Sequence, residues 1–186
     1  MAKRVLVVIA DGCEDVEAVA AIDVLNRAGV DVTVAGLKKG PVKGAYGNTI
    51  GTNISIDGAD DLYDGIVFPG GTKNAQALAA SPRVIELTKR HFDEGRMVAA
   101  ICASPSHVLA EAAGVVAGRR ATGDPVFNEK LAAGGAKLTD EAVTVDGNLI
   151  TAMGPGAALR FGLAMAEYLG HKDTALELAK KWRITA

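Results

Sequence analysis

The sequence predicts an open α/β sandwich, in which helices cover both faces of a mostly parallel sheet. First, residues 3–10 form a short, continuously apolar segment, which is typical of a strand buried on both faces. Second, a helical segment at 14–28 separates it from another apolar strand at 32–35. Such a strand–helix–strand unit requires parallel strands and a right-handed crossover. Third, strands and helices continue to alternate along the chain.

The remaining elements follow from the same signals. Residues 36–63 carry several glycines between short β-like pieces and predict an antiparallel excursion at a sheet edge. Asp146-Gly147-Asn148 predicts a hairpin between strands 142–145 and 149–152. Two further strands are expected at 64–68 and 97–101, and helices at 74–80, 82–94, 105–113, 126–133, 157–169 and 173–181.

Composition limits the function classes. The 186 residues are 49% hydrophobic, enough to bury the core of one domain spanning 1–186. The formal net charge of -2, with both signs spread throughout, argues against sequence-specific binding of nucleic acid. No signal peptide and no apolar run near the ~20 residues of a membrane span are apparent, so no membrane partner is expected. Cys13 and Cys102 make neither a disulfide framework nor a zinc site, so we expect a reducing, cytoplasmic setting without metal or cofactor.

Cys102 is the first candidate catalytic residue. It follows a buried strand and precedes Pro105, which can begin a helix, so the thiol sits on a sharp strand-to-helix turn. A helix dipole and free backbone N–H groups there would favour the thiolate. This is the logic of a nucleophile elbow with sulfur in place of serine oxygen. The alternative is a buried cysteine acting as a small hydrophobe.

Glu17 is the second candidate. At helical spacing it aligns with the apolar stripe of helix 14–28 that should face the sheet. A carboxyl buried there should have a raised pKa. The alternative is that Glu17 only accepts hydrogen bonds from loop N–H groups near the helix start.

Three strand ends bring the candidates together. Pro69-Gly70-Gly71 follows strand 64–68, and its N–H groups could bind an anion, although the motif alone also fits a plain tight turn. Ligands bind beyond the carboxyl ends of the strands in open parallel sheets. We therefore expect Glu17, Gly70, Gly71 and Cys102 at one rim.

Other residues receive non-catalytic interpretations. Helix 14–28 has a second apolar face, which suggests a subunit contact. Cys13, in the loop before that helix, is expected to be non-catalytic. His107 lies one and a half turns beyond Cys102 and is expected on the surface.

With these residues identified, the chain resembles the ThiJ/PfpI superfamily, in the branch of the parkinsonism-associated deglycase and glyoxalase III. The similar stretches cover nearly the whole chain in the family's order. They are Lys3-Arg4-Val5-Leu6-Val7, Gly12-Cys13-Glu14-Asp15-Val16-Glu17, Val32-Thr33-Val34-Ala35-Gly36-Leu37, Phe68-Pro69-Gly70-Gly71, Ala99-Ala100-Ile101-Cys102-Ala103-Ser104-Pro105 and Gly154-Pro155-Gly156.

The resemblance implies a flavodoxin-like fold and a homodimer. It implies Cys102 as nucleophile, Glu17 as its carboxylic partner, and Gly70 and Gly71 as backbone donors. It also implies activity on methylglyoxal, glyoxal or early glycation adducts. Two positions depart from relatives: Ala103 stands where some carry a His after the cysteine, and Asp124 stands before Pro125 where close members carry a His. Asp124 is thus at best a loose substitute in substrate binding.

A mechanism follows from these groups. A protonated Glu17 would donate a hydrogen bond to the Cys102 sulfur, whereas an ionised one would repel the thiolate. Cys102 would add to methylglyoxal, N–H groups near Gly71 and Ala103 would hold the oxyanion, and Glu17 would move a proton between the two carbons to give lactate. The alternative function is an oxidative-stress sensor in which Cys102 stops at the sulfinate without turnover. A weaker third alternative is an inert domain.

Overall fold

A single large sheet organises the computed structural model, which describes residues 2–60 and 62–184. Its seven strands lie in the order β10-β11-β7-β6-β1-β2-β5. All neighbouring pairs are parallel except β10 with β11, an edge hairpin. The strands are β1 (Arg4–Ile9), β2 (Asp31–Gly36), β5 (Ile54–Ser55), β6 (Gly65–Phe68), β7 (Met97–Ile101), β10 (Val143–Asp146) and β11 (Leu149–Ala152). The predicted open, mostly parallel sheet is confirmed.

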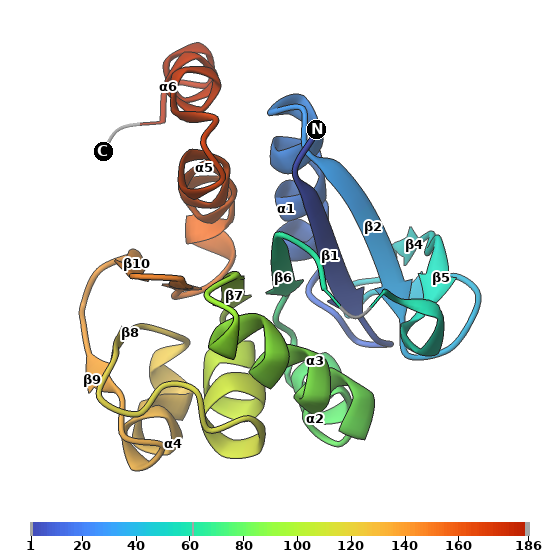
Figure 1. The fold of residues 1–186 in the computed structure, drawn as a ribbon, viewed down its shortest axis with the longest axis vertical. Coiled ribbons are helices and arrows are strands. Elements are labelled where there is room, and N and C mark those ends of the chain that lie inside the picture. Colours follow the sequence, from blue (N-terminus) through green and yellow to red (C-terminus); the bar gives the residue numbers. More distant parts are fainter. Residues whose placement is uncertain (1, 61, 185–186) are drawn as a thin grey trace.

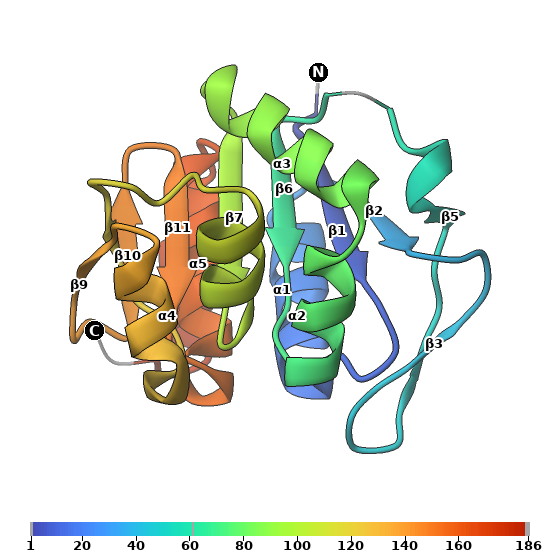
Figure 2. The same cartoon turned by 90° about the horizontal axis from the view of Figure 1, so that it is seen from below.

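Helices cover both faces of the sheet (Figures 1 and 2). One face packs against α1 (Asp15–Arg27), α5 (Ala158–Tyr168) and α6 (Lys172–Lys181). The other packs against α2 (Thr72–Ala79), α3 (Pro82–Asp93), α4 (Asn128–Ala133) and a π-helix at Pro105–Ala112. Among these helices none is long and apolar enough to cross a membrane.

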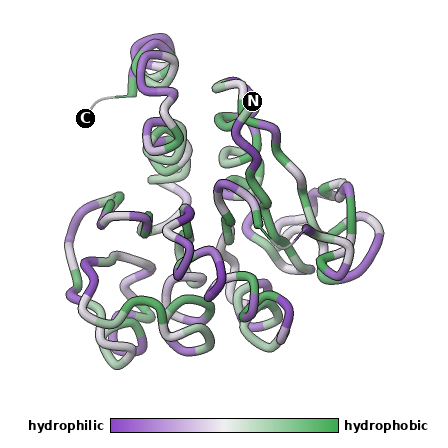
Figure 3. The backbone as a smooth tube through the Cα atoms, in the orientation of Figure 1, coloured by the Kyte–Doolittle hydropathy of each residue, from purple (hydrophilic) through white to green (hydrophobic). Residues whose placement is uncertain are grey.

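Side-chain alternation along the strands builds two separate cores. In β1, Val5, Val7 and Ile9 face the layer of α1, α5 and α6, whereas Leu6 and Val8 face the opposite layer. Because both faces are covered, β6, β7 and β11 are buried along their whole length. The interior strands are accordingly among the hydrophobic segments coloured in Figure 3. This double burial explains the continuously apolar strand sequences.

Most predicted boundaries agree with the structure within two residues, but two regions differ. The 36–63 excursion contains the expected antiparallel pair, β3 (Val42–Lys43) with β4 (Thr49–Ile50), and then β5 joins the main sheet in parallel. A second small sheet of β8 (Arg120–Ala121) and β9 (Lys137–Leu138) was not predicted. Strands of two residues are too short to produce a recognisable period.

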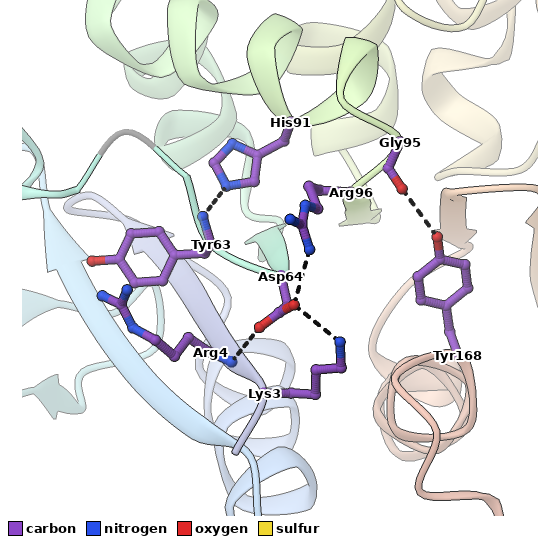
Figure 4. A network of polar contacts seen from close by, with 8 residues as sticks. All are labelled: Lys3, Arg4, Tyr63, Asp64, His91, Gly95, Arg96 and Tyr168. Atoms are coloured by element: carbon purple, nitrogen blue, oxygen red, sulfur yellow. Dashed lines mark hydrogen bonds and ion pairs between the residues drawn. The ribbon is translucent and has the colours of Figure 1, made fainter. Parts of the chain in front are cut away.

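A polar cluster fixes the amino ends of the central strands (Figure 4). The Asp64 carboxylate, just before β6, accepts hydrogen bonds from Arg4 N in β1 (3.0 Å), Lys3 Nζ (3.1 Å) and Arg96 Nη1 before β7 (3.1 Å). Burial opposes the ionisation of Asp64, but these donors and the charges of Lys3 and Arg96 outweigh it and lower its pKa. The strands are therefore held in register at the end opposite their carboxyl termini.

His91 of α3 supports the same region in its neutral form. Its ring is fully buried, with Nδ1–H donating to Leu87 O (2.7 Å) and Nε2 accepting from Tyr63 N (3.0 Å). Burial lowers the pKa of His91, and the charges of Arg90 and Arg96 lower it further. Protonating Nε2 would break the bond to Tyr63, so the fold requires an uncharged imidazole here.

We predict that His91 makes the protein acid-labile below about pH 6.5. The unfolded chain binds a proton that folded His91 resists, so this group lowers the unfolding free energy as pH falls, by at most about 1.4 kcal/mol per pH unit. Urea unfolding of wild type and His91→Gln at pH 5 to 8 measures the effect. The stability difference between them should depend on pH in this window, and a constant difference would contradict the prediction.

Candidate active site

The predicted residues meet beyond the carboxyl ends of β1, β6 and β7, opposite the Asp64 cluster. Glu17 lies in the first turn of α1, Gly70 and Gly71 follow β6, and Cys102 follows β7. A Cβ placed on Gly70 would overlap both Glu17 Oε2 and Cys102 Cβ, so all three residues surround one point. The convergence expected from the sequence is present in the structure.

Cys102 occupies a constrained turn. Its φ of 63° lies in the left-handed region, which among the described non-glycine residues is shared only by Arg183. Such a conformation costs about 1–3 kcal/mol and persists only where neighbouring bonds hold it. Here Cys102 N donates to Ala152 O (3.0 Å) in β11, and Cys102 O accepts from Asp124 N (2.9 Å). The turn aims the partly exposed thiol away from the sheet's hydrogen-bond ladder and toward Glu17.

Glu17 shows both features considered from the sequence: its carboxyl is buried, and it accepts a hydrogen bond from a loop N–H. It is fully buried, and its Oε2 does accept a loop N–H, that of Gly70 (2.7 Å), but from the loop after β6 and not from its own helix start. Its Oε1 has no hydrogen-bond partner among residues 2–60 and 62–184. Burial raises the pKa of Glu17 to about 7, with the charges of Glu14 and Asp124 adding to the effect. The carboxyl can therefore take up or release a proton at neutral pH.

Both glycines are required by close approach. Gly71 has φ 87°, and a Cβ there would overlap Gly12 O. With no side chains in the way, the N–H of Gly71 approaches the Cys102 sulfur, as does the N–H of buried Ala103. Pro69-Gly70-Gly71 is thus more than a tight turn, because it supplies donors to two titratable groups.

The thiol is less acidic than the turn alone suggested. Burial and the negative charge of Glu17 raise the pKa of Cys102 to about 12, against the opposing effect of the Gly71 and Ala103 N–H groups. The N–H groups and the helix dipole expected from the sequence favour the thiolate, but desolvation, which is a tertiary property, opposes it. Protonation of Glu17 removes the repelling charge, so the state of the carboxyl controls the thiolate.

Asp124, which we expected near the site, lies beside the Cys102 sulfur. Its Oδ2 is 3.7 Å from Cys102 Sγ, which donates to it, and its Oδ1 accepts from Val126 N (3.0 Å). A carboxylate in this place adds negative charge, and it raises the pKa of both Cys102 and Glu17.

Cys102 opens into a cavity of about 620 Å³. Asp124 and Gly71 lie on its wall, and Lys43 and Lys73 stand at its exposed rim together with Tyr46, which is 80% exposed. The volume falls in the range of small-molecule sites. It leaves room for a substrate much larger than a three-carbon aldehyde.

Two other predictions can be compared with the structure. His107 was expected on the surface but is buried: Nδ1 donates to Ala103 O (2.9 Å), and the ring packs edge-on against Phe127 at 4.7 Å. The expectation failed because a π-helix has a different period and because Phe127 comes from a distant segment. Cys13 is fully buried beside Gly44, and burial raises its pKa to about 12, so its thiol is shielded.

Asn74 and Ser104 contact the site without having been singled out. Both are fully buried and hydrogen-bond the loop after β6. Asn74 is the first residue of the helix predicted at 74–80, and only its position on the buried side of that helix could have drawn attention.

Known proteins match this chain over almost its full length. Protein dj-1beta of Drosophila melanogaster is 41% identical over 182 residues, covering 97% of this chain and 96% of the relative. A deglycase of Thermococcus kodakarensis is 32% identical over 154 residues, covering 82% of this chain and 91% of the relative. The crystal structure of Drosophila DJ-1beta superposes with a TM-score of 0.93 at 39% identity and 100% coverage of both chains.

These likenesses confirm the resemblance and the flavodoxin-like fold inferred from the sequence. The family model described as DJ-1/PfpI matches residues 3–168, which include every candidate site residue. The chain belongs to the DJ-1/PfpI family.

Proposed function

We propose that this protein is a cofactor-independent enzyme of the deglycase or glyoxalase III type, acting on methylglyoxal or on early glycation adducts. One observation carries the proposal: a fully buried carboxyl with a pKa of about 7 lies directly behind a cysteine that lines an open cavity, and the two side chains meet at Gly70. A nucleophile beside a group that exchanges protons at neutral pH is the arrangement that carbonyl chemistry needs. The deglycase name of relatives supports the same class.

The first step is addition of the Cys102 sulfur to the aldehyde carbon. The S–C bond forms, the C=O π electrons move to oxygen, and the thiol proton ends on that oxygen, giving a hemithioacetal. The N–H groups of Gly71 and Ala103 stabilise the negative charge while it develops.

Glu17 then carries the rearrangement. As a carboxylate it removes the proton from the former aldehyde carbon, and an enediolate forms. The hydroxyl proton passes to the neighbouring oxygen, and Glu17, as a carboxylic acid, returns its proton to the neighbouring carbon, which yields a lactoyl thioester on Cys102. Water hydrolyses the thioester to lactate and the free thiol, so the sum is methylglyoxal plus water to lactate. A pKa near 7 suits both directions of the transfer.

The cavity supports larger substrates as well. Its roughly 620 Å³ accommodates an adducted side chain or nucleotide in addition to the carbonyl fragment. In such an adduct Cys102 attacks the same carbonyl-derived carbon, the bond to the adducted nitrogen or sulfur breaks, and the thiol proton ends on the released amine or thiol. We assign the contact with that leaving group to Asp124, because its carboxylate lies beside the sulfur.

The protein is further proposed to act as a single domain over residues 1–186, in the cytoplasm, as a homodimer. Val16 and Val19 of α1 are 54% and 51% exposed, and Leu159 of α5 is 41% exposed. Val16 and Leu159 border the same groove of about 480 Å³, which continues to Pro155 at the edge of the Cys102 cavity. A second copy of the chain is the occupant we propose for this apolar face.

We predict that Cys102→Ser abolishes lactate formation from methylglyoxal and that Glu17→Gln reduces it by about 10²–10⁴-fold. Lactate is measured enzymatically after incubation with each variant. Cys13→Ala is the matched control, because this thiol is shielded, and should keep wild-type turnover. Turnover retained by Cys102→Ser rules out the mechanism. Wild type without turnover, but with Cys102 converted to sulfinate by mild peroxide, would support the sensor alternative.

The Glu17→Gln variant should also be more stable at high pH. The folded pKa of Glu17 is raised to about 7 from 4.5, so this group lowers stability as pH rises through that interval. Glutamine removes the penalty, and we expect a gain of roughly 3 kcal/mol at most above pH 8, absent below pH 4.5. Thermal unfolding at several pH values measures it. A gain independent of pH would contradict the raised pKa.

We predict that Val16→Lys combined with Val19→Lys converts a dimer to a monomer in analytical ultracentrifugation. Charges on this apolar face would remain unpaired if the face were buried. Leu176→Lys is the control, since Leu176 is 57% exposed on α6, outside this groove. A double variant that sediments as wild-type dimer would place the interface elsewhere.

A further inference from the structure

Asn74 connects the two strand ends that form the site. It is the third residue of α2 and is fully buried. Its Oδ1 accepts from Ala10 N at the end of β1 (2.6 Å), and its Nδ2 donates to Pro69 O (2.8 Å) and Gly70 O (3.1 Å) after β6. The amide is suited to this place because it combines an acceptor and two donors in one side chain.

The two carbonyls belong to the peptide groups that serve the site. In the first, Pro69 O is at one end and the Gly70 N–H, which donates to Glu17 Oε2 (2.7 Å), is at the other. In the second, Gly70 O is at one end and the Gly71 N–H, which faces the Cys102 sulfur, is at the other. Because a peptide group is rigid and planar, fixing its carbonyl also fixes the direction of its N–H.

Each of these two carbonyls accepts a second hydrogen bond from another residue. Pro69 O also accepts from the buried Ser104 Oγ (2.6 Å), two residues beyond Cys102. Gly70 O also accepts from Glu14 N (3.0 Å). Each carbonyl thus has two donors, one of them Asn74. Hydrogen bonds accepted by a carbonyl polarise its peptide and strengthen the donation by its N–H.

We propose that Asn74, assisted by Ser104, is a positioning residue that orients the Gly70 and Gly71 peptide groups toward Glu17 and Cys102. Neither side chain touches the substrate. The inference rests on the proposed function, in which these N–H groups stabilise the carboxylate, the thiolate and the oxyanion. Its consequence is that removing Asn74 loosens both donors at once, although neither glycine nor either titratable residue is changed.

The test is the pH dependence of Cys102 alkylation by iodoacetamide, followed by mass spectrometry of the Cys102 peptide. Wild type, Asn74→Ala, Ser104→Ala and the double variant are compared. Above pH 8 the Glu17 carboxyl is largely ionised and its charge no longer changes, so there the loss of the fixed Gly71 N–H donor should shift the Asn74→Ala profile upward by about 0.5–1 pH unit. Alkylation at pH 9 then slows about 3- to 10-fold. Ser104→Ala should shift less, and the double variant should fall short of the sum because both residues bind Pro69 O.

Asn148→Ala is the matched control. Its Nδ2 also donates to two carbonyls, Phe92 O (3.1 Å) and Arg96 O (2.9 Å), but at the amino end of β7. It should cost similar stability and leave the alkylation profile unchanged. In aldehyde turnover Asn74→Ala should lower kcat and change KM little, because the donors act after substrate has bound.

The outcomes separate the two proposals. If Asn74→Ala and Ser104→Ala lose stability as Asn148→Ala does but keep the wild-type alkylation profile, the positioning role is wrong. If the profile shifts while wild type consumes no aldehyde, the positioning role holds and the proposed enzymatic function fails. Should Asn74→Ala not fold, Ser104→Ala alone decides, since it leaves the Asn74 bonds in place.

Discussion

The hydrogen bond from Gly70 N–H to the buried Glu17 carboxyl is the interaction on which the site depends. This N–H donates to Oε2 of a fully buried acid whose other oxygen, Oε1, lacks a hydrogen-bond partner among the described residues. An acid in that state resists ionisation, and its pKa rises to about 7. The same contact brings the loop after β6 against α1, so that no side chain larger than hydrogen fits at position 70. The contact between Gly70 N and Glu17 Oε2 therefore affects both the pKa of the carboxyl and the packing of the loop against α1.

The two ends of the sheet divide the tasks of stability and reactivity. At the amino ends, Asp64 accepts bonds from three basic residues, and neutral His91 holds Tyr63. Beyond the carboxyl ends of the same strands lie Cys102, whose backbone is in the left-handed region, and Glu17 of α1, whose Oε1 lacks a hydrogen-bond partner among the described residues. Strained and desolvated groups persist only where the surrounding structure holds them firmly. The fully covered parallel sheet provides that support, because its strands are buried on both faces.

The charges around the Cys102 sulfur link the reactivity of the thiol to the protonation of Glu17. Glu17 and Asp124 both oppose formation of the thiolate, whereas the N–H groups of Gly71 and Ala103 favour it. When Glu17 takes up a proton, the larger of the two opposing charges disappears. The reactivity of Cys102 therefore follows the protonation of Glu17, and small shifts in the orientation of the peptide donors change both groups together.

The sequence by itself determined the layered α/β architecture, because apolar strands and amphipathic helices carry periods that are visible in the residues. It also predicted the positions of Cys102, Glu17 and the two glycines at one rim, since parallel strands deliver their carboxyl ends to the same edge. Only the tertiary structure decided the acidity of the thiol, the burial of His107 beneath Phe127 and the attachment of Asn74 to Ala10, Pro69 and Gly70. These properties arise from desolvation and from contacts between residues far apart in the chain, and neither leaves a local pattern.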